Sequence, residues 1–385
     1  MVYLCHTETK VCIQLRTKNL SEDRVSPIRY IRYVHLQMNK KTKIWLAAML
    51  LAVSAGALAE ERPADCVRQN SPETTGFVCR EGGHVSHLVP ADEPVRVEGI
   101  AAFRPENKYT LWYTKPATNW MTSCLPIGNG QFGATLMGQV AVDDVQFNDK
   151  TLWSGKLGGL TSTADYGSYL NFGNLFISSH GMKKVTDYVR YLDINNAVAG
   201  VLFCTDGVAY RRTYFASNPD SCIVIRYTAS QRGKISTTLA LMDQNGGHVR
   251  YVVDKVNQAT ITFDGQIARQ KDGGAATPES YCCTARVVIE GGKVRKNAKG
   301  LIEVSNADCM TIYLRGLTDF DPDAPEYVAG ASRLAGRAAA TVDSAQRRGY
   351  AALLAAHKAD YRSLFDRCQL TLGGSKADIS TPQLI

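Results

Sequence analysis

The sequence lacks the marks of several large classes of protein. It has no cysteine pair with CxxC spacing and no Cys/His cluster, so a structural zinc site is not supported. It has no Gly-x-Ser-x-Gly motif, no phosphate-binding loop and no basic stripe with interleaved aromatic residues, so nothing indicates serine hydrolase, nucleotide or nucleic-acid chemistry. Nothing in the sequence calls for a cofactor or a metal.

The positive charge is confined to one end of the chain. The whole sequence has 44 Lys and Arg against 36 Asp and Glu, a formal net charge of +8. Residues 1–59 hold nine of the basic and three of the acidic residues, so the remainder has 35 against 33. A nearly balanced remainder argues against a nucleic-acid partner.

The basic segment has the pattern of an export signal. Lysines at 40, 41 and 43 precede a short apolar run from Ile44 to Val53, and Ala57-Leu58-Ala59 provides small residues for cleavage. The run is too short to span a bilayer as a mature helix. We therefore expect a signal peptide at 38–59, an upstream extension from a misassigned start at 1–37, and a periplasmic or extracellular protein without a membrane partner after cleavage.

An exported protein folds in an oxidising compartment, where its cysteines can form disulfides. Nine cysteines follow residue 59, an odd number that leaves at least one unpaired. Cys66 and Cys79 bracket a short polar loop and are the favoured pair, whereas the others have apolar surroundings and are expected to be buried thiols.

Short strand-like runs dominate the middle of the chain. Turn signals such as Asp206-Gly207 and Gly291-Gly292 separate them. The runs include 133–142, 197–204, 208–215, 222–228, 235–242, 260–263, 285–289 and 310–314. About a dozen such strands with few helical patterns between them predict a mainly β fold, a large antiparallel β-sandwich over 107–325.

A helical linker is expected after the sandwich, at 326–375. The stretch 335–345 is rich in Ala, and an apolar stripe with helical spacing runs from Tyr350 to Cys368. His357 lies on this stripe and is expected to be a core residue. A helix pair this apolar needs a surface to pack on, and the tail at 376–385 offers none, so the sequence suggests a truncated chain. Residues 60–106 are polar and are expected to be an irregular extension.

Polar and aromatic side chains gather in two neighbouring segments. Glycines at 128, 130 and 133 are expected to serve tight turns, because no strand–helix unit follows that would make a dinucleotide loop. Amide, hydroxyl and indole groups suit sugar hydroxyls and apolar sugar faces, although such residues in a sandwich are more often structural. The candidate substrate-binding or barrel-facing residues are Asn129, Gln131, Asn148, Thr151 and Trp153.

These segments resemble a known family. Leu-Trp-Tyr-x-Lys-Pro-Ala at 111–117, Leu-Pro-Ile-Gly-Asn-Gly at 125–130 and Gln-Phe-Asn-x-x-Thr-Leu-Trp-Ser-Gly at 146–155 resemble the opening of glycoside hydrolase family 95, the α-L-fucosidase family. Similar segments continue in order to about residue 375. The resemblance implies a β-sandwich, a helical linker and then an (α/α)6 barrel that hydrolyses terminal α-L-fucosides or α-L-galactosides with inversion. In that family the acid and base lie on the barrel, so no catalytic residue is assigned in this chain.

One acidic cluster, 319–326, offers local carboxylates. Its prolines favour a surface loop, and a calcium site is the sharper alternative.

Two functions follow from these patterns. In the first, the chain is the β-sandwich of a secreted glycosidase, inactive without the missing barrel and partnered by a fucosylated glycan only in the full-length enzyme. In the second, it is a stand-alone carbohydrate-binding or accessory protein that uses the region of Trp112, Asn129 and Trp153.

Overall fold

The computed structural model describes residues 96–158, 162–370 and 378–384, together with the backbone of four short strands nearer the N-terminus. The chain divides into two compact units, Met1–Pro63 and Ala64–Ile385, and the sandwich lies within the second. In the first unit β1 (Val2–His6) pairs with β2 (Thr9–Ile13). The expected signal peptide at 38–59 lies outside the described residues.

The favoured cysteine pair belongs to a short hairpin. Strands β3 (Cys66–Arg68) and β4 (Phe77–Cys79) are antiparallel, with Cys66 opposite Cys79 in the register. The side chains of both strands lie outside the described part of the chain, so the disulfide stays a prediction. Among the described cysteines, those at 222, 282, 283 and 309 are buried thiols as expected, those at 124 and 204 are partly buried, and Cys368 is exposed.

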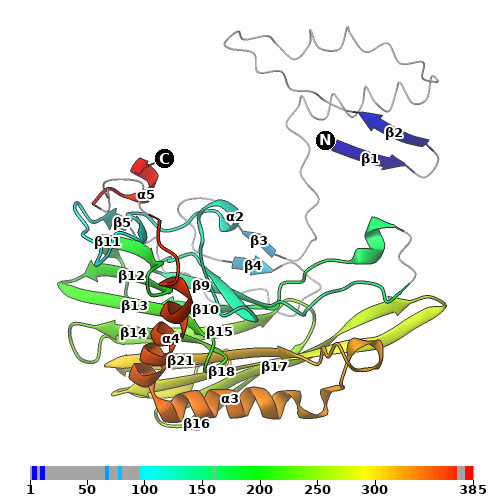
Figure 1. Cartoon of the computed structure of the whole chain (residues 1–385). Coiled ribbons are helices and arrows are strands. Elements are labelled where there is room, and N and C mark those ends of the chain that lie inside the picture. The colour runs from blue at the N-terminus through cyan, green and yellow to red at the C-terminus, as the bar shows by residue number, and fades with distance from the viewer. Residues whose placement is uncertain are drawn as a thin grey trace, which may run out of the picture. The chain divides into compact units, whose positions relative to one another are not determined.

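Two large sheets form the body of the second unit (Figure 1). The seven-stranded sheet has the order β19 (Lys293–Lys296), β20 (Ile302–Ala307), β15 (Ile235–Asp243), β10 (Gly173–Ser179), β9 (Val142–Asp149), β8 (Phe132–Leu136), β7 (Leu125–Gly128). The ten-stranded sheet has the order β16 (His248–Lys255), β17 (Gln258–Lys271), β18 (Gly274–Glu290), β21 (Cys309–Thr318), β14 (Cys222–Ala229), β13 (Val208–Ser217), β12 (Val198–Thr205), β11 (Lys184–Asp193), β5 (Arg96–Gly99), with β6 (Thr110–Tyr113) also on β11. Every pairing is antiparallel except that of β5 with β11. The predicted fold class, a mainly β antiparallel sandwich followed by short helices, is confirmed.

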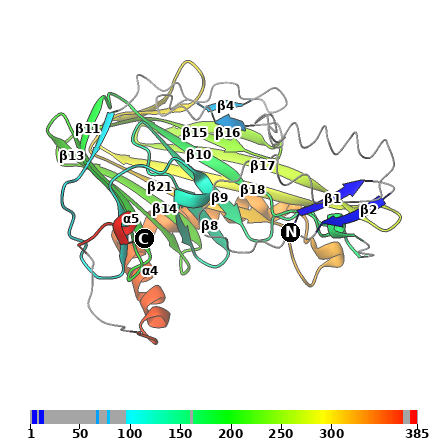
Figure 2. The same ribbon diagram turned by 90° about the horizontal axis from the view of Figure 1, so that it is seen from above.

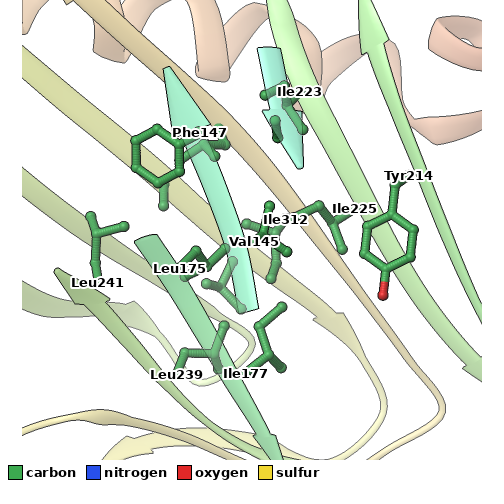
Figure 3. Close-up of a cluster of buried hydrophobic side chains, with 14 of the residues drawn as sticks. Val145, Phe147, Leu175, Ile177, Tyr214, Ile223, Ile225, Leu239, Leu241 and Ile312 are labelled. Carbon is green, nitrogen blue, oxygen red and sulfur yellow. The ribbon is translucent and has the colours of Figure 1, made fainter. Parts of the chain in front are cut away.

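The core lies between the inner faces of the two sheets (Figure 3). Val145, Leu175 and Leu239 from the smaller sheet are fully buried against Ile223 and Ile312 from the larger one. Alternation along each strand puts these residues on one face, and each buried aliphatic side chain stabilises the fold by roughly 1.5–3 kcal/mol. This packing fixes how the two sheets meet at their ends.

A buried ionic group crosses the core. The carboxylate of Asp143 accepts hydrogen bonds from the hydroxyls of Tyr214 and Tyr227, the latter at 2.6 Å, and lies 3.7 Å from Arg212. Arg212 donates in turn to the carbonyls of Gln139 at 2.6 Å and Val140 at 2.7 Å. These contacts tie β13 and β14 of the larger sheet to the start of β9 in the smaller one.

The two main helices cover part of the outer face of the larger sheet. In α3 (Leu334–Arg348), Ala338 packs with Cys282 and Leu317, and Val342 packs with Tyr313. The expectation that the helices find no surface within the chain is therefore wrong for α3, because the outer sides of β14, β18 and β21 are apolar where it lies.

Helix α4 (Tyr350–Phe365) has its buried residues, Leu353 and His357, in its first half, and its last residue, Phe365, contacts Tyr109. Its His357 is buried, donates from Nε2 to the carbonyl of Ala197 at 3.0 Å and lies against Phe215, so the expected core role is confirmed. Further along, Leu364 is 60% exposed and the end of α4 projects past the sheets (Figure 2).

The remaining helical elements are short: α2 (Trp120–Ser123), η2 (Thr163–Tyr166), η3 (Pro325–Tyr327), η4 (Ala331–Arg333) and α5 (Thr381–Leu384). A hydrogen bond of 2.9 Å from the backbone N–H of Trp112 to the hydroxyl of Thr381 joins α5 to β6. Within the described ranges, no helix has the length and apolar character needed to cross a bilayer.

Candidate functional site

The five residues singled out in the sequence lie at one end of the smaller sheet. Asn129 and Gln131 belong to the turn between β7 and β8, and Asn148 lies near the end of β9. Strand pairing places Gly133 opposite Asn148, and the backbone N–H of Lys150 donates to the carbonyl of Gln131 at 3.0 Å. The two segments are thereby brought together, as their shared chemistry suggested.

The side chain of Asn129 makes its hydrogen bonds within the protein. Its side-chain oxygen accepts from the backbone N–H groups of Gln131 at 3.1 Å and Phe132 at 2.8 Å, and its amide nitrogen donates to the carbonyl of Ser217 at 3.1 Å. An Asn in this pattern replaces backbone partners in a tight turn. Its observed contacts are structural.

Gln131 and Thr151 converge on a residue that the sequence did not single out, Asp149. The carboxylate oxygen Oδ1 of Asp149 accepts from the Gln131 amide at 2.7 Å, the Thr151 hydroxyl at 2.6 Å and the Thr151 backbone N–H at 3.0 Å. The hydroxyls of Thr151 and Thr318 are 2.6 Å apart, and Thr318 belongs to β21 of the other sheet. Asp149 therefore closes this end of the sandwich. An Asp two residues before a Thr is a local turn signal that could have found it.

Further charged residues meet at this end, all of them buried. Glu279 on β18 is 2% exposed, and Arg315 and Asp319 are also buried. Burial raises the pKa of Glu279 to about 7, with Arg269 opposing the shift and Asp319 and Asp149 adding to it. One carboxylate oxygen each of Asp149 and Glu279 has no hydrogen-bond partner in the described structure.

This group shares one property with the carboxylate pair of a glycoside hydrolase, the raised pKa of the Glu279 carboxyl. An acid with a raised pKa beside ionised carboxylates is typical of glycosidase sites. Glu279 and Asp149, however, are 2% and 0% exposed, so a sugar cannot reach them. The arrangement fits a structural role.

Trp153, by contrast, is exposed on the loop that follows β9. It is 43% exposed and is bridged to Tyr169, whose ring centroid is 5.9 Å away. Its indole N–H donates to the carbonyl of Tyr166. Asn148 is bonded to the end of this loop. Its side-chain oxygen accepts a hydrogen bond from the backbone N–H of Phe172 at 2.7 Å.

Trp112 does not belong to this surface. It is 4% exposed, lies on β6 in the larger sheet and packs on Phe103 with a centroid distance of 5.4 Å. The binding region expected from Trp112, Asn129 and Trp153 together is therefore wrong as a unit. Of these three, only Trp153 presents an accessible aromatic ring.

The acidic cluster at 319–326 does not converge on one point. Asp319 accepts from the backbone N–H of Ser280 at 2.8 Å, whereas Glu326 pairs with Lys271 at 2.5 Å and accepts from the N–H of Thr277 at 2.6 Å. In the described ranges no group of three or more His, Cys, Asp or Glu residues could hold a metal ion. The carboxylates instead bind the loop to β17 and β18, which argues against the calcium alternative.

The large two-sheet sandwich is an N-terminal domain of the glycoside hydrolase class, as its match to a family of known domains shows. Residues 111–167 and 157–323 match the glycosyl hydrolase family 65 N-terminal domain, over more than half of the sequence. The chain belongs to this family, and the expectation of a glycoside hydrolase N-terminal domain is confirmed.

Curated relatives are α-fucosidases, which is compatible with the resemblance to family 95. The chain is 28% identical over 323 residues to alpha-L-fucosidase 2 of Arabidopsis thaliana, covering 71% of this chain and 38% of that protein. It is 24% identical over 252 residues to a probable alpha-fucosidase A of Aspergillus oryzae, covering 55% of this chain and 34% of that protein. The chain thus spans little more than a third of the length of these relatives.

A solved structure, a putative kojibiose phosphorylase from human microbiome, is also similar. It shares 11% identity at a TM-score of 0.42 and covers 70% of this chain and 39% of that one. A likeness this remote adds nothing to the assignment.

Proposed function

We propose that this chain is the N-terminal β-sandwich of an exported, inverting glycoside hydrolase that removes terminal α-L-fucosyl or α-L-galactosyl residues from glycans. The observation that carries the proposal is the similarity to α-fucosidases over 55–71% of the chain. The catalytic groups belong to an (α/α)6 barrel outside this chain, which is the partner of the sandwich in the whole enzyme.

The burial of the local carboxylates supports this division of labour. An inverting glycosidase needs two carboxyl groups about 6.5–9.5 Å apart, with room between them for the attacking water and the sugar. Glu279, whose pKa is about 7, would be the best acid by its ionisation alone, yet it is enclosed between the sheets. The sandwich therefore has to act by supporting a catalytic region rather than by cleaving the bond.

Hydrolysis by the chain itself tests the proposal. The purified chain, incubated with an aryl α-L-fucoside, is expected to release no aryl alcohol above the uncatalysed rate. A protein extended by the reading frame that follows the codon for Ile385 is expected to release it and to give the inverted sugar, seen by NMR of the first-formed anomer. Turnover by the chain alone, or an extended protein that has a barrel but does not cleave fucosides or galactosides, would contradict the proposal.

A second function is a non-catalytic carbohydrate-binding or accessory protein. The exposed ring of Trp153 is the observation that favours it. It differs from the first in requiring no barrel, so the extended reading frame separates the two.

A further inference from the structure

The loop between β9 and β10 presents three aromatic side chains to solvent. Trp153 is 43% exposed, Tyr166 is 58% exposed and Tyr169 is 45% exposed. We call these three residues the aromatic platform. Exposed aromatic side chains that are grouped on one segment of a folded protein indicate a binding surface, whereas single exposed ones do not.

The platform is fixed in place before any ligand arrives. The indole N–H of Trp153 donates to the carbonyl of Tyr166, and Trp153 forms a β-bridge with Tyr169. Between them, the backbone N–H of Ser154 donates to the carbonyl of Ser168 at 3.1 Å, and the Ser154 hydroxyl accepts from the Ser168 N–H at 2.9 Å. These bonds hold the two sides of the loop together.

Two glycines make this arrangement possible. Gly167 has φ +69°, and a Cβ there would overlap the backbone of Gly155. A Cβ at Gly155 would lie 2.9 Å from the carbonyl oxygen of Tyr166 and 3.1 Å from the indole ring of Trp153. The two sides of the loop therefore approach more closely than other residues would allow, which orients the Trp153 ring against the loop.

The loop is also anchored to the larger sheet. The backbone N–H of Leu157 donates to the carbonyl of Gln270 on β17 at 2.8 Å. The Lys156 ammonium lies 2.5 Å from the carboxylate of Asp272, beyond the end of β17. Rigid anchoring lowers the entropy lost when a ligand binds, which favours even a weak ligand.

The chemistry of the loop selects a neutral, hydroxyl-rich ligand. Between Trp153 and Tyr169 the sequence has one basic and one acidic residue, Lys156 and Asp165. The pKa of Lys156 is raised by its hydrogen bond with Asp272 and by the negative charges of Asp272 and Asp165. The charges of the loop thus balance within the protein. The other polar residues of the loop are mainly serines and threonines, and this mixture of rigid rings, hydroxyls and glycines suits a ligand with both apolar faces and hydroxyl groups.

From these observations we infer that the aromatic platform of Trp153, Tyr166 and Tyr169 binds the neutral sugar units of a glycan, with a pyranose ring stacked on the indole of Trp153. The choice of ligand class rests on the proposed function, but the binding itself belongs to this chain and needs no catalytic region. The platform holds the glycan by its uncharged rings and takes no part in bond cleavage.

Calorimetric titration of the chain with 2′-fucosyllactose and with lactose tests the inference. We expect saturable binding of at least one of the two sugars by the wild-type chain, and affinity at least about tenfold lower for Trp153→Ala. Trp153→Phe keeps an aromatic face and is expected to retain part of the affinity. Equal thermal unfolding midpoints show that a variant has kept its fold.

Trp120 provides a matched control. It is 42% exposed and, like Trp153, donates its indole N–H within the protein, to the hydroxyl of Thr135 at 2.8 Å. It lies on α2, and its indole contacts β8 at Thr135, whereas the indole of Trp153 contacts the loop after β9 at Tyr166. Trp120→Ala is expected to leave the affinity unchanged.

Three outcomes would overturn the inference. In the first, the wild-type chain binds neither sugar at tens of millimolar concentration, and in the second, Trp120→Ala weakens binding as much as Trp153→Ala does. The third is a dimer that Trp153→Ala dissociates in light-scattering measurements, which would assign the platform to a second copy of the chain. Absence of binding here leaves fucoside hydrolysis by the extended protein untouched, so the two proposals fail separately.

Discussion

At the scale of single residues, the end of the sandwich is held by charged groups that water does not reach. Asp149 gathers Gln131 and Thr151, and Thr151 continues to Thr318 in the other sheet. Removing one partner from such a network leaves a buried polar group unpaired, which costs more than the hydrogen bond itself contributes. The geometry of the loop after β9 therefore depends on hydrogen bonds that Asp149, Gln131 and Thr151 make within the protein.

Glu279 makes the stability of the sandwich depend on pH. Its pKa is raised from 4.5 to about 7, so the folded protein binds a proton more tightly than the unfolded chain does. The free energy of unfolding is therefore expected to fall as the pH rises from about 4.5 to about 7 and to level off above that. Glu279→Gln should remove this dependence on pH. The free energy of unfolding of the variant, taken relative to that of the wild-type protein, should be higher at pH 8 than at pH 5 by about 1–3 kcal/mol, measured by urea unfolding.

Glu98→Gln is the control, because the side chain of Glu98 on β5 is 42% exposed and its ion pairs with Arg96 and Lys184 lie at the surface, where such pairs contribute little. It should leave the pH profile as it is in the wild-type protein. A Glu279→Gln variant with the wild-type profile would show that the carboxyl of Glu279 is not the group that titrates.

The sequence pointed to this end of the molecule but not to its central residue. Asn129, Gln131, Asn148, Thr151 and Trp153 stood out because of their side-chain chemistry and local spacing. Asp149 and Glu279 did not, because their importance arises from the register of β9 and β18, which are more than 100 residues apart in the sequence. No local sequence pattern predicts that Asp149 and Glu279 lie close together.

At the scale of elements, α3 is held by a narrow apolar contact. Ala338 is fully buried against Cys282 and Leu317, whereas Ala340 is exposed on the other side of the same helix. Ala338→Glu is expected to destabilise the protein by about 2–4 kcal/mol, because it places a carboxylate in an apolar contact. Hydrogen exchange should show faster exchange of the amides of α3.

Ala340→Glu is the control. It makes the same replacement in the same helix, with the same change in helix propensity, and should leave the hydrogen exchange of the α3 amides unchanged. Equal effects of the two substitutions would mean that α3 is not held by the face that contains Ala338.

Element positions were largely predictable, and their arrangement was not. The predicted strand at 222–228 is β14, Cys222–Ala229, and the helix expected at 335–345 is α3, Leu334–Arg348. Both follow from local periodicity. The support that the sheet gives to α3 was missed, because the outer faces of three strands become a single apolar surface only after they pair.

At the scale of the whole molecule, export remains a prediction from the sequence. Cleavage after Ala59 is expected to give a mature protein that begins at Glu60, which N-terminal sequencing or intact-mass measurement of the exported protein would reveal. Deleting residues 1–37 should not alter the product, because the signal begins at Met38.

Ala59→Asp should block cleavage, because signal peptidase requires a small residue there, and Glu60→Asp is the matched control that should be processed normally. Finding the uncleaved chain inside the cell, with no exported product, would contradict this assignment.

The position of β21 sets the order in which the larger sheet can be completed. Strand β14 ends at Ala229, but its second neighbour, β21, begins only at Cys309, after six further strands have been made. At a synthesis rate of about 5–20 residues per second, the open edge of β14 waits roughly 4–16 s for its partner. During that interval a fully apolar ribbon, Cys222 to Ile225, has unused hydrogen-bonding groups along one side. An unpaired apolar edge of this kind can pair with another chain, so a chaperone that binds it is expected to reduce aggregation during synthesis.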